Sequence, residues 1–253
     1  MEMEMVPLWR LMLSYQREHV SNHMHNTIWE ICLPIFIVQR PVYPEHIAAK
    51  IEQPNLLNLI QKFIYNQQHS DHISDSSVSA LPIFYGKINI YPSAIATFHA
   101  PSDISGIGGM RRERIRAVKS WRKGPGRYDT IFVNTDPTVE GMQGLEVARV
   151  RLFFSFSHDG VEYPCALVHW FSRVGDLPDN CTGMWVVEPD TCDDGRPFTS
   201  IIHLDTIVRA SHLLPVFGQE HVSKTLLFTD TLDTFTRFYV NKYIDHHAFE
   251  IAF

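Results

Sequence analysis

The chain has 253 residues, of which 45% are hydrophobic and 20% charged, ordinary proportions for a folded protein with a substantial core. They exclude long disorder, a collagen-like repeat and a small disulfide scaffold. The formal net charge of −6 gives no sign of nucleic-acid binding by bulk charge alone. The longest apolar run, 31–38, is too short for a membrane helix, and the acidic N-terminus lacks the basic region of a secretory signal. We therefore expect a soluble intracellular chain.

The first third of the sequence predicts helices. Residues 8–29 form a weakly amphipathic pattern, and a second helix is indicated after Asn55, which is a suitable N-cap residue. Its apolar positions recur at helical spacing: Leu56, Leu57, Leu59, Ile60, Phe63 and Ile64. Residues 67–80 are rich in Gln, His, Ser and Asp, so we predict a polar linker there, between an N-terminal helical segment (1–66) and a domain over 81–253.

The pattern changes toward strands after residue 80. The runs 83–91 and 94–100 are predicted as strands, and a turn-rich loop over 101–109 follows them. Good helix formers over 110–120 predict a helix, and 128–133 is predicted as a short strand.

The second half carries the clearest strand signals. Two β-rich runs, 147–156 and 162–171, are joined through an Asp-Gly pair at 159–160, which is a strong hairpin signal. Shorter strands are expected at 184–187 and 198–207.

These elements together predict an α+β protein. N-terminal helices precede a β-rich half that forms a small, partly open barrel or twisted sheet, with its barrel-like part over 145–218. A C-terminal helix from about residue 230, capped by Asp230, is expected to close it. The apolar positions of that helix are Leu232, Phe235, Phe238 and Tyr239.

Charge is concentrated in one basic segment, 110–128. It holds eight bases and only one acid, Glu113, whereas the remainder of the chain holds 14 bases and 27 acids. The bases are Arg111, Arg112, Arg114, Arg116, Lys119, Arg122, Lys123 and Arg127. Such a segment is either an interaction surface or a stripe neutralised by the protein's own acids, for which Asp176, Asp193 and Asp194 are candidates.

Two features beside the basic run also point to nucleic acid. Trp121 lies inside the run and either stacks on a base or anchors the segment to the sheet. The loop containing Gly106, Gly108 and Gly109 is a candidate anion site, because its backbone N–H groups can converge ahead of a helix N-terminus. It is neither a Walker nor a Rossmann motif, and an ordinary tight turn is the alternative.

Metal and catalytic sites find little support. Cys165, His169, Cys181 and Cys192 could supply four zinc ligands, but they lack the short-spaced pairs that zinc sites use. The acids near the predicted strands, namely Asp129, Asp136, Glu140 and Asp205, read more simply as turn, edge and capping residues than as a two-metal site. No nucleophile motif occurs. We expect no enzyme activity, no metal and no cofactor.

Three aromatic residues offer a different function. Trp170, Trp185 and Tyr163 lie on predicted strands of the barrel. They either pack in its core or form a cage for methylated lysine, as in chromatin-reader barrels of the BAH or SH3-like kind.

Long stretches of the sequence resemble the C-terminal region of Plavaka-type transposases, proteins of DNA transposons found in mushroom-forming fungi. The resemblance rests on residues 102–176, on TGMWVVEP (182–189), on 201–218 and on FYVNKYIDHHAFEIAF (238–253). It runs from about Leu56 to the last residue, and the first 50 residues or so do not continue the pattern. It implies a transposon-derived, fungal origin and a nuclear location. The strand-transfer carboxylates of that family lie upstream of the matching segment, so catalysis does not carry over.

We therefore expect a non-catalytic module that contacts the nucleic-acid backbone through 111–127, with little dependence on base sequence. One alternative is a protein-interaction or chromatin-reader-like barrel that binds histone tails or a transposase subunit. Another is an inert transposon remnant. An exposed face of basic side chains would favour the first function, and pairing with acids would count against it.

Overall fold

The structure is a computed structural model that describes residues 29–33, 41–69, 81–102, 108–219, 221–227 and 229–253. The helix expected over 8–29 lies outside these residues except at its last position, where strand β1 (Trp29–Cys32) begins. Most of the expected linker, from residue 70 to residue 80, also lies outside them.

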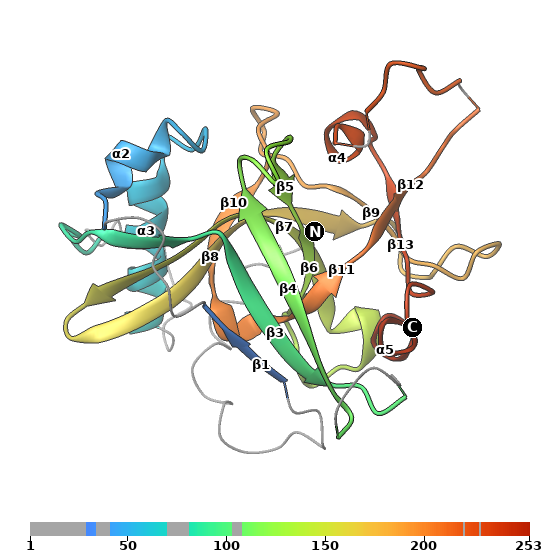
Figure 1. Cartoon of the computed structure of the whole chain (residues 1–253), viewed down its shortest axis with the longest axis horizontal. Helices are drawn as coiled ribbons and strands as arrows, with labels where there is room; N and C mark the ends of the chain where they lie inside the picture. The colour runs from blue at the N-terminus through green and yellow to red at the C-terminus, as the bar shows by residue number, and fades with distance from the viewer. Residues whose placement is uncertain (1–28, 34–40, 70–80, 103–107, 220, 228) are drawn as a thin grey trace, which may run out of the picture.

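Two antiparallel sheets make up most of the described chain (Figure 1). The smaller sheet has the order β1-β3-β4-β5, with β3 at Ser93–His99, β4 at Met110–Val118 and β5 at Arg127–Tyr128. The larger sheet has the order β11-β6-β7-β8-β9-β13-β12, with β10 paired to β8 and β2 paired to β7. Its strands are β2 (Ile88–Tyr91), β6 (Thr130–Asn134), β7 (Leu145–His158), β8 (Val161–Arg173), β9 (Val186–Pro189), β10 (Thr199–His203), β11 (Ile207–Ser211), β12 (Leu213–Pro215) and β13 (Phe238–Val240).

Two chain segments pass from one sheet into the other. β2 continues into β3 at Pro92, whose carbonyl accepts the Ala117 N–H at 3.0 Å. β5 continues into β6 at Asp129, whose N–H donates to Arg116 O and whose carbonyl accepts from Val150 N. Because of these crossings the sheets curl round a shared interior and form a nearly closed barrel, with β11 lying against β1, β3 and β4. The α+β prediction with a barrel-like half is confirmed.

Small and large apolar side chains alternate inside the barrel. Ala94 and Ala96 of β3 let the two sheets approach closely, and Phe98 and Phe153 fill the space beside them. Burial of side chains of this size stabilises each by about 1.5–3 kcal/mol. A separate cluster around Trp185 lies between the larger sheet and the C-terminal residues.

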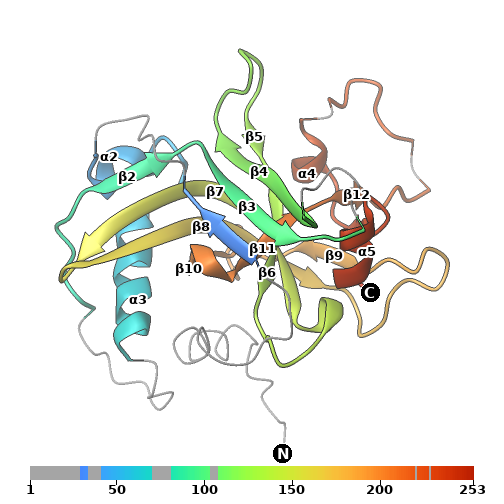
Figure 2. The same ribbon diagram turned by 60° about the horizontal axis from the view of Figure 1, so that its bottom comes forward.

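Helix α3 (Leu56–Gln68) is confirmed where the sequence predicts it, and the short α2 (Pro44–Ala48) precedes it. Helix α3 lies against the turn end of the β7–β8 hairpin (Figure 2), where Ile60 and Phe63 pack in one cluster with Phe154 and Phe156. Asn55 occupies the N-cap position but makes no side-chain capping hydrogen bond, so the expected cap is wrong. The helix therefore shares a core with strands that follow residue 80.

The long hairpin is also confirmed. β7 and β8 pair through the turn at Asp159 and Gly160, whose φ angles are 50° and 78°. Two successive positive φ values define the primed turn that an Asp-Gly pair favours, because its twist matches that of the strands.

Residues 110–118 form a strand, so the helix predicted over 110–120 is wrong. β4 pairs with β3 along seven residue pairs, from Ser93↔Arg116 to His99↔Met110. Ile115 and Ala117 point into the barrel, and Arg114 and Arg116, which alternate with them, point out, which is a period of two. Helix propensity is a weak preference, and a pairing edge together with a buried face outweighs it.

The helix predicted from residue 230 is likewise wrong. Only α4 (Thr231–Thr234) forms there, and Asp230 makes no side-chain cap. Phe238 and Val240 become buried strand residues of β13 instead. The closing helix is α5 (His246–Ile251), and Asp245 Oδ1 caps it by accepting the Ala248 N–H at 2.7 Å. Short 3₁₀ turns occur at Gly141–Gln143 and Leu204–Thr206. Within the described chain, no helix combines the length and the apolarity that crossing a bilayer requires.

Candidate nucleic-acid interface

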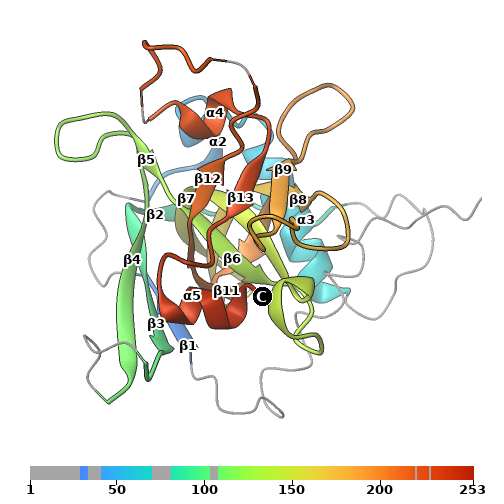
Figure 3. The same cartoon turned by 90° about the vertical axis from the view of Figure 1, so that its right-hand side faces the viewer.

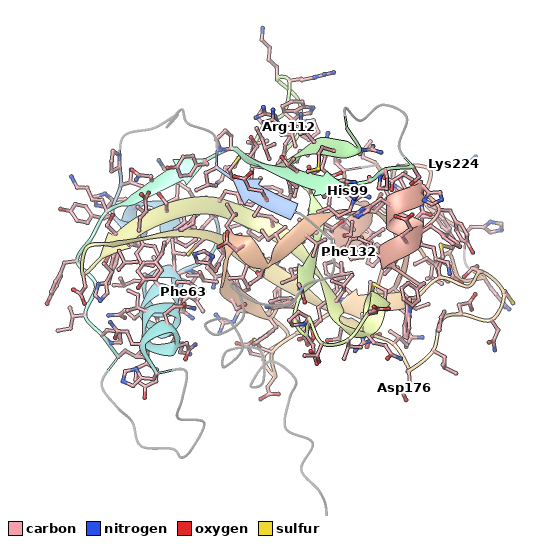
Figure 4. The ribbon with its side chains drawn as sticks, turned by 90° about the horizontal axis from the view of Figure 1, so that it is seen from below. Phe63, His99, Arg112, Phe132, Asp176 and Lys224 are labelled. Carbon is pink, nitrogen blue, oxygen red and sulfur yellow. The ribbon has the colours of Figure 1, made fainter. Side chains whose placement is uncertain are left out.

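The alternation of β4 divides the basic segment between two faces. Arg112 and Arg114 are exposed and Arg116 is half-buried on the outside of the smaller sheet. Arg112 lies on the side of the molecule away from Phe63 of α3 (Figure 4). Residues two apart in a strand lie about 6.8 Å apart. The three arginine side chains therefore leave the strand at evenly spaced positions on one face.

The loop between β4 and β5 adds more positive charge to the same side. This hairpin projects from the body of the molecule (Figures 2 and 3) and carries the exposed Lys119, Arg122 and Lys123. Arg122 and Lys123 have φ angles of 52° and 64°, which are unfavourable for residues other than glycine. The backbone of Trp121 closes the loop with two hydrogen bonds. Its backbone N–H donates to Pro125 O at 3.0 Å, and its carbonyl accepts the Gly124 N–H at 2.8 Å.

Trp121 is the centre of an arginine cluster. The guanidinium carbons of Arg116, Arg122 and Arg127 lie 4.2, 5.3 and 6.0 Å from its ring centroid. Cation–π attraction holds these side chains near the ring although they repel one another. The indole thus gathers the arginines, whereas the sequence left open whether it stacks on a base or anchors the segment. We call Arg112, Arg114, Arg116, Lys119, Arg122, Lys123 and Arg127, together with Trp121, the outer basic surface.

The protein's own acids neutralise little of this surface. Asp129 accepts from the Arg116 N–H at 2.9 Å and from Arg127 Nε at 2.6 Å, and the latter is the only ion pair that these seven side chains make with a described acid. Asp194 is paired with Arg196 instead. Burial and the neighbouring charge of Arg127 lower the pKa of Arg116, against the attraction of Asp129. A surplus of positive charge therefore remains.

Arg111 does not belong to the outer basic surface. It shares the parity of Glu113 in β4, so both lie on the opposite face, where Arg111 Nη1 is 3.8 Å from Asp245 Oδ2. The sequence could not assign Arg111 and Arg112 to opposite faces. A helix was predicted there, and a helix distributes its side chains over its faces with a period of about 3.6 residues instead of two.

β4, β11 and α5 come together at this place (Figure 3), and a buried ionic cluster joins them. Arg209 is 3% exposed and donates to both Asp245 oxygens, at 2.8 and 2.7 Å. It also lies 3.4 Å from Glu113 Oε2 and donates to His247 Nδ1 at 3.2 Å. Glu113 Oε1 accepts the Ala210 N–H. The guanidinium carbon lies 4.7 Å from the Phe98 ring centroid.

Burial and charge shift the pKa values in this cluster in opposite directions. Burial raises the pKa of Glu113, although Arg209 opposes it. Burial also acts to raise the pKa of Asp245, but its hydrogen bonds with Arg209 and Ala248 prevail and lower it to about 2. Burial and Arg209 lower the pKa of His247 to about 4, so this imidazole is neutral at pH 7.

The glycine loop lacks the helix that the anion-site hypothesis required. Gly106 lies outside the described residues, and Gly108 and Gly109 have φ angles of 61° and 76°. They lead into β4, and a Cβ on Gly109 would lie 2.9 Å from His99 Nε2. The glycines are explained by a tight turn, so the contribution expected from a helix N-terminus is wrong.

The three barrel aromatics lie in three different clusters. Trp170 lines the barrel interior and donates Nε1–H to Ser200 Oγ at 2.7 Å. Trp185 donates to Phe253 O at 3.2 Å from a second cluster, and Tyr163 packs against α3 in a third. Core packing therefore explains them, and they do not form a common cage.

The possible zinc ligands are also separated. Cys165 is buried in β8, where burial raises its thiol pKa, whereas Cys181 and Cys192 are exposed on loops. Among the residues that the structure places, no three His, Cys, Asp or Glu side chains are grouped as a metal site would need.

Two further arginines, which the sequence analysis did not single out, lie next to the outer basic surface. Arg149 and Arg151 of β7 lie 5.8 and 4.4 Å from the ring centroid of Tyr128, which follows Arg127 in β5. Arg149 is paired with Asp233 at 2.6 Å, and burial followed by repulsion from Arg149 lowers the pKa of Arg151. Two arginines within the otherwise apolar stretch 147–154 of β7 were the available signal. Burial, Arg151 and Arg149 lower the pKa of the adjacent His169 to about 4.

Comparison with known proteins assigns no function to this surface. No family model matches the chain, and neither the curated proteins nor the solved structures give a significant match. A function must therefore be inferred from the chemistry of the outer basic surface itself.

Proposed function

We propose that this chain is a nucleic-acid-binding module that holds the phosphate backbone on its outer basic surface. The observation that carries the proposal is the placement of seven basic side chains on one side, with one ion pair among them to a described acid. If the protein's own acids neutralised the basic segment, most of these seven side chains would be paired with carboxylates.

Phosphate binding fits the residue types on this surface. Five of the seven bases are arginines, whose planar guanidinium groups can donate two parallel hydrogen bonds to a phosphate. Each phosphate that is neutralised releases condensed counterions, which supplies affinity without reading a base. Phosphate contacts set position and orientation but carry no sequence information, so we infer little sequence preference.

The origin inferred from the sequence belongs to the same proposal. The resemblance to Plavaka-type transposases supports a transposon-derived, non-catalytic module that acts in the nucleus. In that setting the outer basic surface would hold transposon or target DNA while another part of a transposase performs strand transfer.

The test compares two pairs of arginines with the same loss of charge. In R112Q/R114Q the two exposed arginines of β4 lose their charge, whereas R196Q/R237Q removes arginines that are paired with Asp194 and Glu188. Binding to a labelled duplex is measured by fluorescence anisotropy over a range of salt concentrations. We expect the log–log salt slope to become shallower by about 2 in the first variant, because each phosphate contact contributes about 0.9.

The second variant is expected to bind as the wild type does, and thermal melts check that both variants are folded. Equal binding by both pairs, or a wild-type chain that does not bind even at low salt, would overturn the proposed function.

A further inference from the structure

A cavity of about 1060 Å³ lies between α3, β10, the end of β8 and the loop after β9. Phe63 and Asp176, which line it, lie on the side of the molecule away from Arg112 (Figure 4). Its volume is at the upper end of the range for small-molecule and side-chain pockets. The cavity is therefore separate from the outer basic surface.

The floor of the cavity is apolar and aromatic. It is formed by Trp170, Phe171, Phe198 and Ile201, with Leu59 of α3 beside them. Trp170 is 5% exposed, and its ring N–H is already bonded to Ser200. Phe171 and Ile201 are also buried, so the half-buried Phe198 and Leu59 offer most of the ring and aliphatic surface to an apolar part of a ligand.

Two carboxyl groups lie above this floor. Burial raises the pKa of Glu146, with Arg173 opposing the rise and Asp190 adding to it. Burial also raises the pKa of Asp190, against hydrogen bonds from Thr191 and Ser172. Arg173 lines the same cavity, but its Nη1 donates to Met142 O at 3.0 Å and its guanidinium lies 5.6 Å from the Trp185 ring centroid. One cation that is engaged elsewhere thus faces two carboxyl groups.

Acids outnumber bases around the whole cavity. Asp176 and Asp193 lie in its wall with Glu146 and Asp190, whereas Lys62 and Arg173 are its bases. A negative cavity repels phosphates and attracts cations. The ligand that this chemistry favours has a positive head and an apolar stem.

We propose that this cavity binds a lysine side chain presented by a lysine-rich segment of a partner protein. The butyl stem lies along Phe198 and Leu59, and the ammonium group donates to Glu146 and Asp190. The volume leaves room for residues on either side of the lysine. The interaction is independent of the outer basic surface, so the chain can hold nucleic acid on one side and a basic protein segment on the other.

Binding in this way is coupled to protons. An ammonium group stabilises the charged form of both carboxyl groups, so a carboxyl that holds a proton in the free protein releases it when the lysine enters. The other charged groups facing the cavity are Arg173, Lys62, Asp176 and Asp193. Affinity is therefore expected to rise with pH above the ordinary pKa range of carboxyl groups, because burial raises the pKa of both Glu146 and Asp190.

The test uses a fluorescein-labelled octapeptide of alternating lysine and alanine, and the same peptide with glutamine in place of lysine. Anisotropy is measured with the full chain, with E146Q/D190N and with the matched control E45Q/D159N. The control removes two acids outside the cavity lining: Glu45, exposed on α2, and Asp159, in the β7–β8 turn. We expect about tenfold weaker binding of the lysine peptide by E146Q/D190N, unchanged binding by the control, and no binding of the glutamine peptide.

Two results would overturn the proposal. One is equal affinity of both variants for the lysine peptide, which would show attraction to the overall negative charge alone. The other is a wild-type chain that binds the glutamine peptide as tightly as the lysine peptide, and this measurement needs no variant to fold.

Discussion

Arg209 shows how one buried charge can be tied to three elements. It extends from β11 to Asp245 ahead of α5 and to Glu113 of β4, with both carboxylates within 3.4 Å. A buried ion pair contributes little net stability when it forms, but removal of one partner leaves an uncompensated charge and costs about 3–5 kcal/mol. His247 accepts a hydrogen bond from the same guanidinium, so the cluster requires the imidazole to be neutral.

That requirement predicts a loss of stability in mild acid. His247 and His169 have pKa values of about 4 in the folded state and about 6.5 when unfolded. The unfolded chain therefore binds more protons between these values. The free energy of unfolding should fall as the pH drops from about 6.5 to about 4. Urea denaturation at several pH values, for the wild type and for H247Q, measures the effect.

The contribution of His247 to the pH dependence of stability can be separated from that of the carboxyl groups. H247Q keeps a hydrogen-bond acceptor but does not titrate, so its stability should fall less steeply over this pH range, by up to about 3 kcal/mol. Asp245, with its pKa of about 2, loses its contribution only below about pH 4, and Glu113, whose pKa is raised, acts in the opposite direction. Identical pH profiles of the wild type and H247Q would contradict the assignment.

The β4–β5 hairpin is the element on which the proposed function depends. Its register brings Val118 opposite Arg127, so a two-residue turn could join the strands directly. Replacement of residues 119–126 by Asn-Gly should keep the hairpin and remove Trp121 with three bases. We expect weaker binding to a labelled duplex, with the log–log salt slope reduced by about 2.7.

A second variant distinguishes charge from the aromatic ring. K119Q/R122Q/K123Q keeps the loop length and Trp121 but removes the same three charges. The two variants should bind alike if neutralisation of phosphates by the three loop charges dominates. Much weaker binding by the loop replacement would show that Trp121 contributes as well, by stacking on a base or by holding Arg116 and Arg127 in place. Wild-type affinity of the loop replacement would exclude the hairpin from the interface.

The same element shows where sequence reasoning succeeds and where it fails. The run of bases is visible in the sequence, and so is the Asp-Gly turn between β7 and β8, because both are local. That 110–118 is a strand depends on β3 as its neighbour, and the parity that separates Arg111 from Arg112 follows only from that pairing. Arg209 lies 96 positions along the chain from Glu113 and 36 from Asp245, and no local pattern can reveal contacts over such separations.

Charge is distributed unevenly over the whole molecule, although its sum is modest. A basic surface lies on one side and an acidic cavity on another, within a chain of net charge −6. The sequence indicated the first, because seven of its bases are close along the chain. It did not indicate the second, because Glu146, Asp176 and Asp190 come from separate strands and loops that only the barrel brings together.

In the described chain, residues before and after the expected linker share a hydrophobic core and a sheet. This leads to a prediction about whether the chain can be divided at the linker. Ile60 and Phe63 of α3 pack with Phe154 and Phe156 of the β7–β8 hairpin, and β1 extends the smaller sheet beside β3. A fragment of residues 81–253 would expose that apolar surface to water and leave β3 as an open edge. We expect it to aggregate or to melt without cooperativity, whereas the full chain should show a single transition in calorimetry.

Point variants in the full chain make the same comparison without truncation. I60A/F63A should lower the single melting temperature, because each large-to-small change in a shared core costs about 2–5 kcal/mol. A separate early transition in this variant, or a cooperative melt of the 81–253 fragment, would show instead that the N-terminal helical segment folds apart from the barrel. In one shared core, loss of packing at α3 must destabilise every strand that contacts it, which is why a single transition at a lower temperature is the expected result.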